Sequence, residues 1–197
     1  HFRAQSCLDD AVFLAGVLNT LTATLYKIAN DLRLMASGPR AGLNELSLPP
    51  LQPGSSIMPG KVNPVMCESI IQVSHYVSGL CQTVLLSGRD GQLQLNTNLP
   101  LTSHALLHSI DCLTNGINIF TEKCLTHLQV NEEQCQKYID RTLMKVTALN
   151  SIIGYDKASQ VAKKAFEENK TLKEVLVELD ILSEAEADNL LDAKNMV

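Results

Sequence analysis

The sequence predicts an all-α fold in which long antiparallel helices form a bundle and a small helical domain follows. Residues 5–36 place apolar side chains at a helical period over about eight turns. Two more long periodic segments follow, separated by loops, and the helices become shorter after residue 130. The chain is 45% hydrophobic but has only four Phe, four Tyr and no Trp, so its aliphatic interior favours helix packing.

The first helix ends at Ser37-Gly38-Pro39-Arg40, a helix stop followed by a turn. Residues 41–64 are a proline-punctuated loop. A second helix begins near Pro64, whose fixed φ suits a first helical turn, and runs to about Leu86. A third helix spans about 101–128. Long helices with loops at their ends predict an antiparallel bundle over residues 1–130.

A second, all-helical domain is expected over residues 131–197. Its helices are predicted at about 131–141, 155–168, 171–178 and 183–192. Thr171 and Ser183 are each followed three residues later by Glu, which is the pattern of a capping box.

Composition excludes several classes of function. The net charge is −5, and no basic patch suited to phosphate backbones is present, so nucleic acid is not an expected partner. The apolar runs, such as residues 11–18, are shorter than a membrane span. Six cysteines without a Cys-x-x-Cys pair predict reduced thiols in the cytoplasm and no zinc site. The start at His1, with helical sequence directly after it, leads us to expect a piece of a longer polypeptide.

Residues 54–64 combine two glycines, two prolines, two adjacent serines, one lysine and one asparagine. Pro59 and Pro64 each lack a backbone donor, and Gly54 and Gly60 permit backbone angles that other residues avoid. The segment is therefore a loop rich in groups that bind an anion, and long loops of this kind are commonly lids or binding loops.

This segment, Gly-Ser-Ser-Ile-Met-Pro-Gly-Lys-Val-Asn-Pro, resembles the signature loop of the fumarase/aspartase superfamily. The likeness covers essentially the whole chain: residues 27–33 and 37–45 resemble the helix end before that loop, and residues 143–157 resemble the C-terminal domain. It implies that residues 1–130 are the C-terminal part of the central bundle domain. It also implies a homotetrameric lyase acting on small dicarboxylates, needing no metal or cofactor, with each active site built from three subunits.

The resemblance also implies roles for the residues of the loop. Ser55 maps to the base that removes a proton next to a carboxylate, and Lys61 and Asn63 map to ligands of the substrate carboxylates. Ser56 shapes the loop and is a candidate substrate ligand. The structural alternative is that the serine hydroxyls cap the turn and Lys61 is a solvated surface lysine.

Two further residues match family positions near the active site. Glu68, in the first turn of the second helix, maps to a Glu that pairs with a His of another subunit; otherwise it complements the helix dipole. Asn96 maps to a position close to the site; otherwise it ends a helix. His104 and His108 have the i, i+4 spacing of a metal pair without an evident third ligand, so a packed or surface pair is expected.

Three functions are left open. Cys67-Glu68 favours fumarate hydratase, whereas residues 42–45 and 91–96 look more like aspartate ammonia-lyase. The substrate is accordingly fumarate and malate, or aspartate. A non-catalytic helical-bundle assembly module is the alternative of another class. Two earlier signature regions of the family do not occur in these 197 residues, so we expect the chain to be inactive by itself.

Overall fold

The computed structural model describes residues 3–196, and the chain forms two compact units, residues 1–131 and 132–197. The start at His1 and Phe2, from which we inferred a longer polypeptide, lies outside the described residues.

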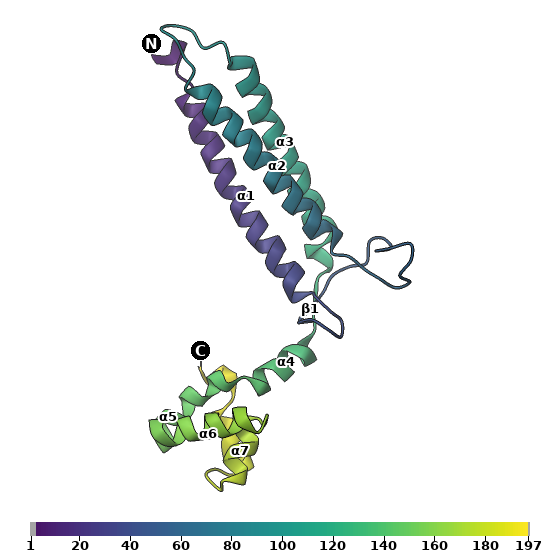
Figure 1. Cartoon of the computed structure of the whole chain (residues 1–197), viewed down its shortest axis with the longest axis vertical. Coiled ribbons are helices and arrows are strands. Elements are labelled where there is room, and N and C mark those ends of the chain that lie inside the picture. The colour runs from purple at the N-terminus through teal and green to yellow at the C-terminus, as the bar shows by residue number, and fades with distance from the viewer. Residues whose placement is uncertain (1–2, 197) are drawn as a thin grey trace. The chain divides into compact units, whose positions relative to one another are not determined.

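Three long helices make up most of the first unit: α1 (Asp9–Met35), α2 (Val65–Gly88) and α3 (Leu99–Lys123). Figure 1 shows them side by side, and α2 packs against both of the others. The short elements of this unit are η1 (Arg3–Gln5), β1 (Leu46–Ser47), η2 (Leu125–His127) and β2 (Gln129–Val130). The predicted all-α fold with long antiparallel helices is confirmed.

A small clip closes the end of this unit at which α1 and α3 finish. β1 and β2 pair antiparallel, with Leu46 opposite Val130. The side-chain amide of Asn131 donates to the backbone oxygen of Asn44 at 2.8 Å, and the Glu45 N–H donates to the Met35 oxygen at 2.9 Å. The prediction that residues 46–47 are loop was wrong, because they pair with β2, which lies more than eighty positions away in the sequence.

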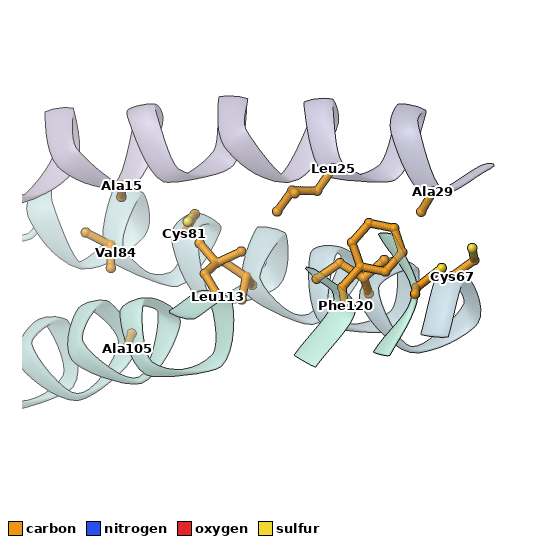
Figure 2. Packing of buried hydrophobic residues seen from close by; sticks show 12 residues of the cluster. Ala15, Leu25, Ala29, Cys67, Cys81, Val84, Ala105, Leu113 and Phe120 are labelled. Atoms are coloured by element: carbon orange, nitrogen blue, oxygen red, sulfur yellow. The ribbon is translucent and has the colours of Figure 1, made fainter. Parts of the chain in front are cut away.

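The contact surface of α2 has a heptad-like spacing. Its buried positions are separated alternately by three and four residues, the 3.5-residue period of a coiled coil. These positions are Cys67, Ile70, Ser74, Val77, Cys81 and Val84. Many of the buried residues that face one another here are small, including Ala15, Ala29 and Ala105 in Figure 2. The hydroxyls of Ser74 and Ser109 donate to carbonyl oxygens one turn earlier, so these polar groups are satisfied inside the core.

The large aliphatic residues of α1 lie mostly outside this contact surface. Leu21 and Ile28, which belong to the predicted helical period, are 37% and 43% exposed, and Phe13 is 75% exposed. The small residues Ala15, Thr22 and Ala29 occupy the face toward α2 and α3 instead. The exposed face is apolar enough to pack against another protein surface.

Helix α1 is also long and apolar enough to cross a membrane, judged by length and composition alone, which corrects the expectation that no segment reaches that length. The same properties occur in a core helix of a soluble assembly. Asp9 and Asp10 lie in its first turn and Arg33 in its last turn, where each charge complements the helix dipole.

The second unit is built from short helices: α4 (Glu132–Arg141), η3 (Leu143–Leu149), α5 (Asn150–Ile153), α6 (Tyr155–Glu167), α7 (Leu172–Glu178), α8 (Glu184–Leu190) and η4 (Ala193–Met196). Both predicted capping boxes are confirmed, at Thr171 with Glu174 and at Ser183 with Glu186. The Glu178 carboxylate accepts hydrogen bonds from Lys164 Nζ at 2.8 Å and Lys170 Nζ at 2.6 Å. These bonds connect α6 to α7 and lower the pKa of the Glu178 carboxyl to about 2.

We expect the chain to associate in solution, because the apolar residues on the outer faces of α1 and α3 are exposed in the single copy. Light scattering on the purified chain should give a mass above the 21.5 kDa of one copy. Leu107→Glu, at a 62% exposed position on α3, should shift the chain toward the monomer because a charge cannot be buried unpaired. Exposed Glu167→Gln, in α6, is the control. A monomer at all concentrations would contradict this expectation.

Candidate active site

Residues 54–61 form a loop that is closed at its neck by backbone hydrogen bonds. The Gly54 N–H donates to the Lys61 carbonyl at 2.8 Å, and the Lys61 N–H donates to the Met58 carbonyl at 3.2 Å. Asn63 adds a third closure, since its side-chain amide donates to the Gly54 carbonyl at 3.2 Å. The loop therefore has a defined conformation although most of its residues are exposed.

Two glycines are needed for different reasons. A Cβ on Gly54 would lie 2.6 Å from the Lys61 carbonyl oxygen, so the close approach at the neck excludes any side chain there. Gly60 has open space around it but a φ of +80°, which residues with a side chain rarely adopt.

The two serines differ in their surroundings. Ser55 is half-buried, and its Oγ accepts a hydrogen bond from the Ile57 N–H at 3.3 Å. Ser56 is exposed and makes no hydrogen bond to another described residue. This hydrogen bond is the one expected if the Ser55 hydroxyl only caps the turn. A donor to this oxygen also stabilises its deprotonated form, so the same bond is compatible with action as a base.

Lys61 carries the only charge between Glu45 and Glu68 in the sequence. It is exposed, and no carboxylate of residues 3–196 lies within ion-pair distance of it. Ser55, Met58 and Lys61 line a shallow hollow together with neighbouring prolines. An unneutralised ammonium beside a hydroxyl is a suitable environment for a carboxylate ligand.

The N-terminus of α2 lies directly after this loop. Pro64 is the residue that caps α2 rather than its first helical residue, with φ −78° and ψ 60°, and it provides no side-chain hydrogen bond to the helix. The Glu68 N–H donates to the Pro64 carbonyl at 3.1 Å. The positive end of the α2 dipole thus faces the segment that holds Asn63 and Lys61, which favours an anion there.

Glu68 is partly exposed in the first turn of α2, and its carboxylate oxygen lies 3.9 Å from the Arg33 guanidinium in the last turn of α1. No role for Arg33 was predicted from the sequence. The antiparallel course of α1 and α2, which places the end of one beside the start of the other, was the signal that could have found it.

Asn96 does not join the loop within one chain. It is 1% exposed, donates to the Ser87 carbonyl at 3.0 Å and accepts from the Asn98 N–H at 2.8 Å. Ser87 belongs to the last turn of α2, about 33 Å along the helix from its start. Asn96 therefore fixes the connection between α2 and α3 at the end of the bundle remote from residues 54–64.

His104 and His108 form a stacked pair on α3 with ring centroids 5.7 Å apart. His108 also contacts the Tyr76 ring edge-on at 5.7 Å and lies 3.7 Å from the Cys112 sulfur. Within residues 3–196 no group of three His, Cys, Asp or Glu side chains is placed to hold a metal ion.

Known proteins resemble this chain along nearly its whole length. Residues 1–79 match a family model described as lyase, and residues 146–197 match one described as fumarase C C-terminus. Class II fumarate hydratase of Thermosynechococcus vestitus is 50% identical over 187 residues, which is 95% of this chain and 40% of that protein.

Two solved structures share the fold. Class II fumarase of Schistosoma mansoni matches with a TM-score of 0.89 and 40% identity over 97% of this chain and 40% of that one. A fumarate lyase:delta crystallin structure from Brucella melitensis matches with a TM-score of 0.95 and 39% identity over 98% of this chain and 42% of that one. This chain thus spans about 40% of the length of the curated relatives that it matches.

The helical bundle and its loop place the chain in a class of all-α lyases. More specifically, the chain belongs to the fumarase/aspartase superfamily.

Gly54→Ala tests the neck of the loop. The added Cβ would push the Lys61 carbonyl away and break a hydrogen bond worth about 1 kcal/mol, so the loop should open about fivefold more often. Trypsin under native conditions should then cleave after Lys61 about fivefold faster, with the melting temperature nearly unchanged. Gly79→Ala on α2 is the control, because no atom lies within 4 Å of its added Cβ. An unchanged rate of cleavage would show that the neck does not hold the loop.

Proposed function

We propose that the chain supplies the signature-loop part of a fumarate hydratase, which interconverts fumarate and malate. The observation that carries this proposal is the closed loop, which presents the half-buried Ser55 beside the N-terminus of α2, together with Lys61, which has no carboxylate partner among residues 3–196. The similarity to class II fumarate hydratases supports the choice within the superfamily.

In the direction of malate dehydration, Ser55 Oγ takes a proton from the carbon next to a carboxylate. The electron pair left on carbon delocalises into that carboxylate, which becomes a dianion. The hydroxyl on the neighbouring carbon then takes a proton from an acid in another part of the composite site and leaves as water, and the double bond of fumarate forms. Hydration is the same sequence reversed. The Ile57 N–H stabilises Ser55 Oγ when it is deprotonated.

The dianion is the species that the site must stabilise most. Lys61 supplies a full positive charge, and the second N–H of the Asn63 amide remains to donate to substrate after the first has closed the neck. Ser56 is a further donor, and the α2 dipole adds to the same field. The loop backbone and the Asn63 amide are held by hydrogen bonds before substrate arrives, so little reorganisation of the backbone is required.

The remaining parts of the site come from other subunits in this proposal. Asn96 lies at the end of the bundle opposite to the loop of its own chain, so it can approach a loop only in a neighbouring copy. Glu68 is exposed enough to pair with a His of such a copy, and the Arg33 guanidinium lies 3.9 Å from its carboxylate. A homotetramer in which apolar faces of α1 and α3 are buried satisfies both requirements. The six free cysteines support a cytoplasmic location.

Ser55→Ala, in a polypeptide that also carries the two earlier signature regions, should lower kcat for fumarate hydration by about 10²- to 10⁴-fold. The decrease follows from removal of the base, and the oligomer should stay intact. The measurement is fumarate absorbance together with light scattering. Ser56→Ala, which removes the neighbouring hydroxyl, should cost less than about tenfold in kcat and serves as the control. Unchanged activity in Ser55→Ala would support a non-catalytic assembly module instead.

The 197-residue chain alone should not turn over fumarate, because it holds only the signature-loop part of a composite site. The same absorbance assay applies to the chain and to the longer polypeptide, with malate and aspartate offered separately. Turnover by the isolated chain would contradict the composite site. If the longer polypeptide preferred aspartate to malate, the proposed function would become aspartate ammonia-lyase instead of fumarate hydratase.

A further inference from the structure

A hollow of about 490 Å³ lies within the second unit, among α4, η3, the start of α7 and the end of α8. Its lining carries three lysines, three aspartates and an apolar part to which Ile139 and Leu191 contribute. The volume falls in the range of sites for small molecules. The proposed chemistry of the loop uses none of these residues, so the charges gathered here have no role in it.

Lys145 is the charge in this hollow that is least satisfied. Its side chain is only 11% exposed, and the one acidic atom of residues 3–196 within ion-pair distance, Asp140 Oδ1, lies 3.8 Å from its Nζ. That separation is too long for a hydrogen bond, and the same oxygen already accepts from the Gln136 amide at 2.8 Å. A mostly buried ammonium without a hydrogen-bond acceptor is costly, so an acceptor that enters the hollow is stabilised there.

The other two lysines of the hollow are satisfied without a ligand. The Lys173 ammonium donates to Asp188 at 2.9 Å and lies 3.0 Å from the Glu184 carboxylate, so its charge is neutralised. Lys194 is exposed, and water can solvate its charge. Lys145 is therefore the cation from which a bound ligand would gain most.

The acidic residues of the hollow decide what kind of anion fits. A ligand with negative charge alone would meet Asp140, Asp188 and Asp192 as well as Lys145, and these carboxylates would repel it. A ligand with both charges avoids this repulsion, because its cation can pair with Asp140, whose side chain is 53% exposed. An α-amino acid carries its ammonium and its carboxylate on the same carbon, so one molecule can pair with both Asp140 and Lys145.

We propose that this hollow binds a free α-amino acid with a short aliphatic side chain. The ligand carboxylate accepts from Lys145 Nζ, its ammonium donates to Asp140, and its side chain lies against Ile139 and Leu191. Ile139 is 37% exposed, so apolar surface is available to such a side chain. The site does not depend on the proposed function, because all of its residues lie in the second unit.

The test compares three ligands on the 197-residue chain: L-norvaline, pentanoate, which lacks the amino group, and 1-aminobutane, which lacks the carboxylate. Binding is followed by NMR of labelled isoleucine methyl groups. The Ile139 signal should shift and saturate with L-norvaline, at an affinity at least about tenfold higher than for either partial ligand. The signal of Ile70, which is buried in the first unit, should not move. Equal affinity for pentanoate, or no saturable shift of Ile139, would overturn the proposal.

Two variants test the charged pair. Lys145→Met keeps the length of the side chain but removes its charge, and it should weaken L-norvaline binding at least about tenfold. Lys163→Met is the matched control, because Lys163 is exposed on α6 and does not line the hollow. If Lys145→Met does not fold, Asp140→Asn provides the second measurement and should reduce the affinity for L-norvaline to that for pentanoate. Unchanged L-norvaline affinity in Asp140→Asn would contradict the pairing and overturn the site.

Discussion

The close packing of α2 between α1 and α3 is the constraint on which the rest of the first unit depends. Its alternating three- and four-residue spacing brings Cys67, Ser74 and Cys81 to the contact surface, with alanines from the neighbouring helices opposite. Small residues at these positions let the helix backbones approach closely. The antiparallel course then places the end of α1, the start of α2 and the end of α3 together, and the loop emerges there.

The choice of small residues for much of the inner face leaves several larger apolar residues of α1 and α3 outside, although Leu25 and Leu113 are buried. A chain that folded alone would bury its Leu and Phe side chains first, because each contributes about 1.5–3 kcal/mol when removed from water. Here Phe13 and Leu107 stay mostly exposed while alanines are buried. This inversion is explained if the three helices are part of a larger helical assembly, and it also explains why α1 resembles a membrane helix in composition.

Features that depend on neighbouring residues were predictable, and those that depend on topology were not. The capping boxes at Thr171 and Ser183 and the course of the long helices follow from local spacing, and the structure confirms them. The β1–β2 pairing joins residues more than eighty positions apart, so no local pattern predicts it. Within the site, the loop is one continuous segment and could be recognised, whereas the Arg33–Glu68 pair exists only because two helices run antiparallel.

The loop shows how one set of groups can serve both conformation and chemistry. Asn63 closes the neck with one amide hydrogen and keeps another for a ligand, and Ser55 accepts the Ile57 N–H that shapes the turn. In a purely structural loop, Ser56 could be exposed without any role, and Lys61 could pair with a carboxylate as Lys164 of α6 and Lys173 of α7 do. Lys61 instead stays without an acidic partner among residues 3–196. A positive charge on a closed loop beside a helix N-terminus suits an arriving anion, so the electrostatics favour ligand binding over a purely structural loop.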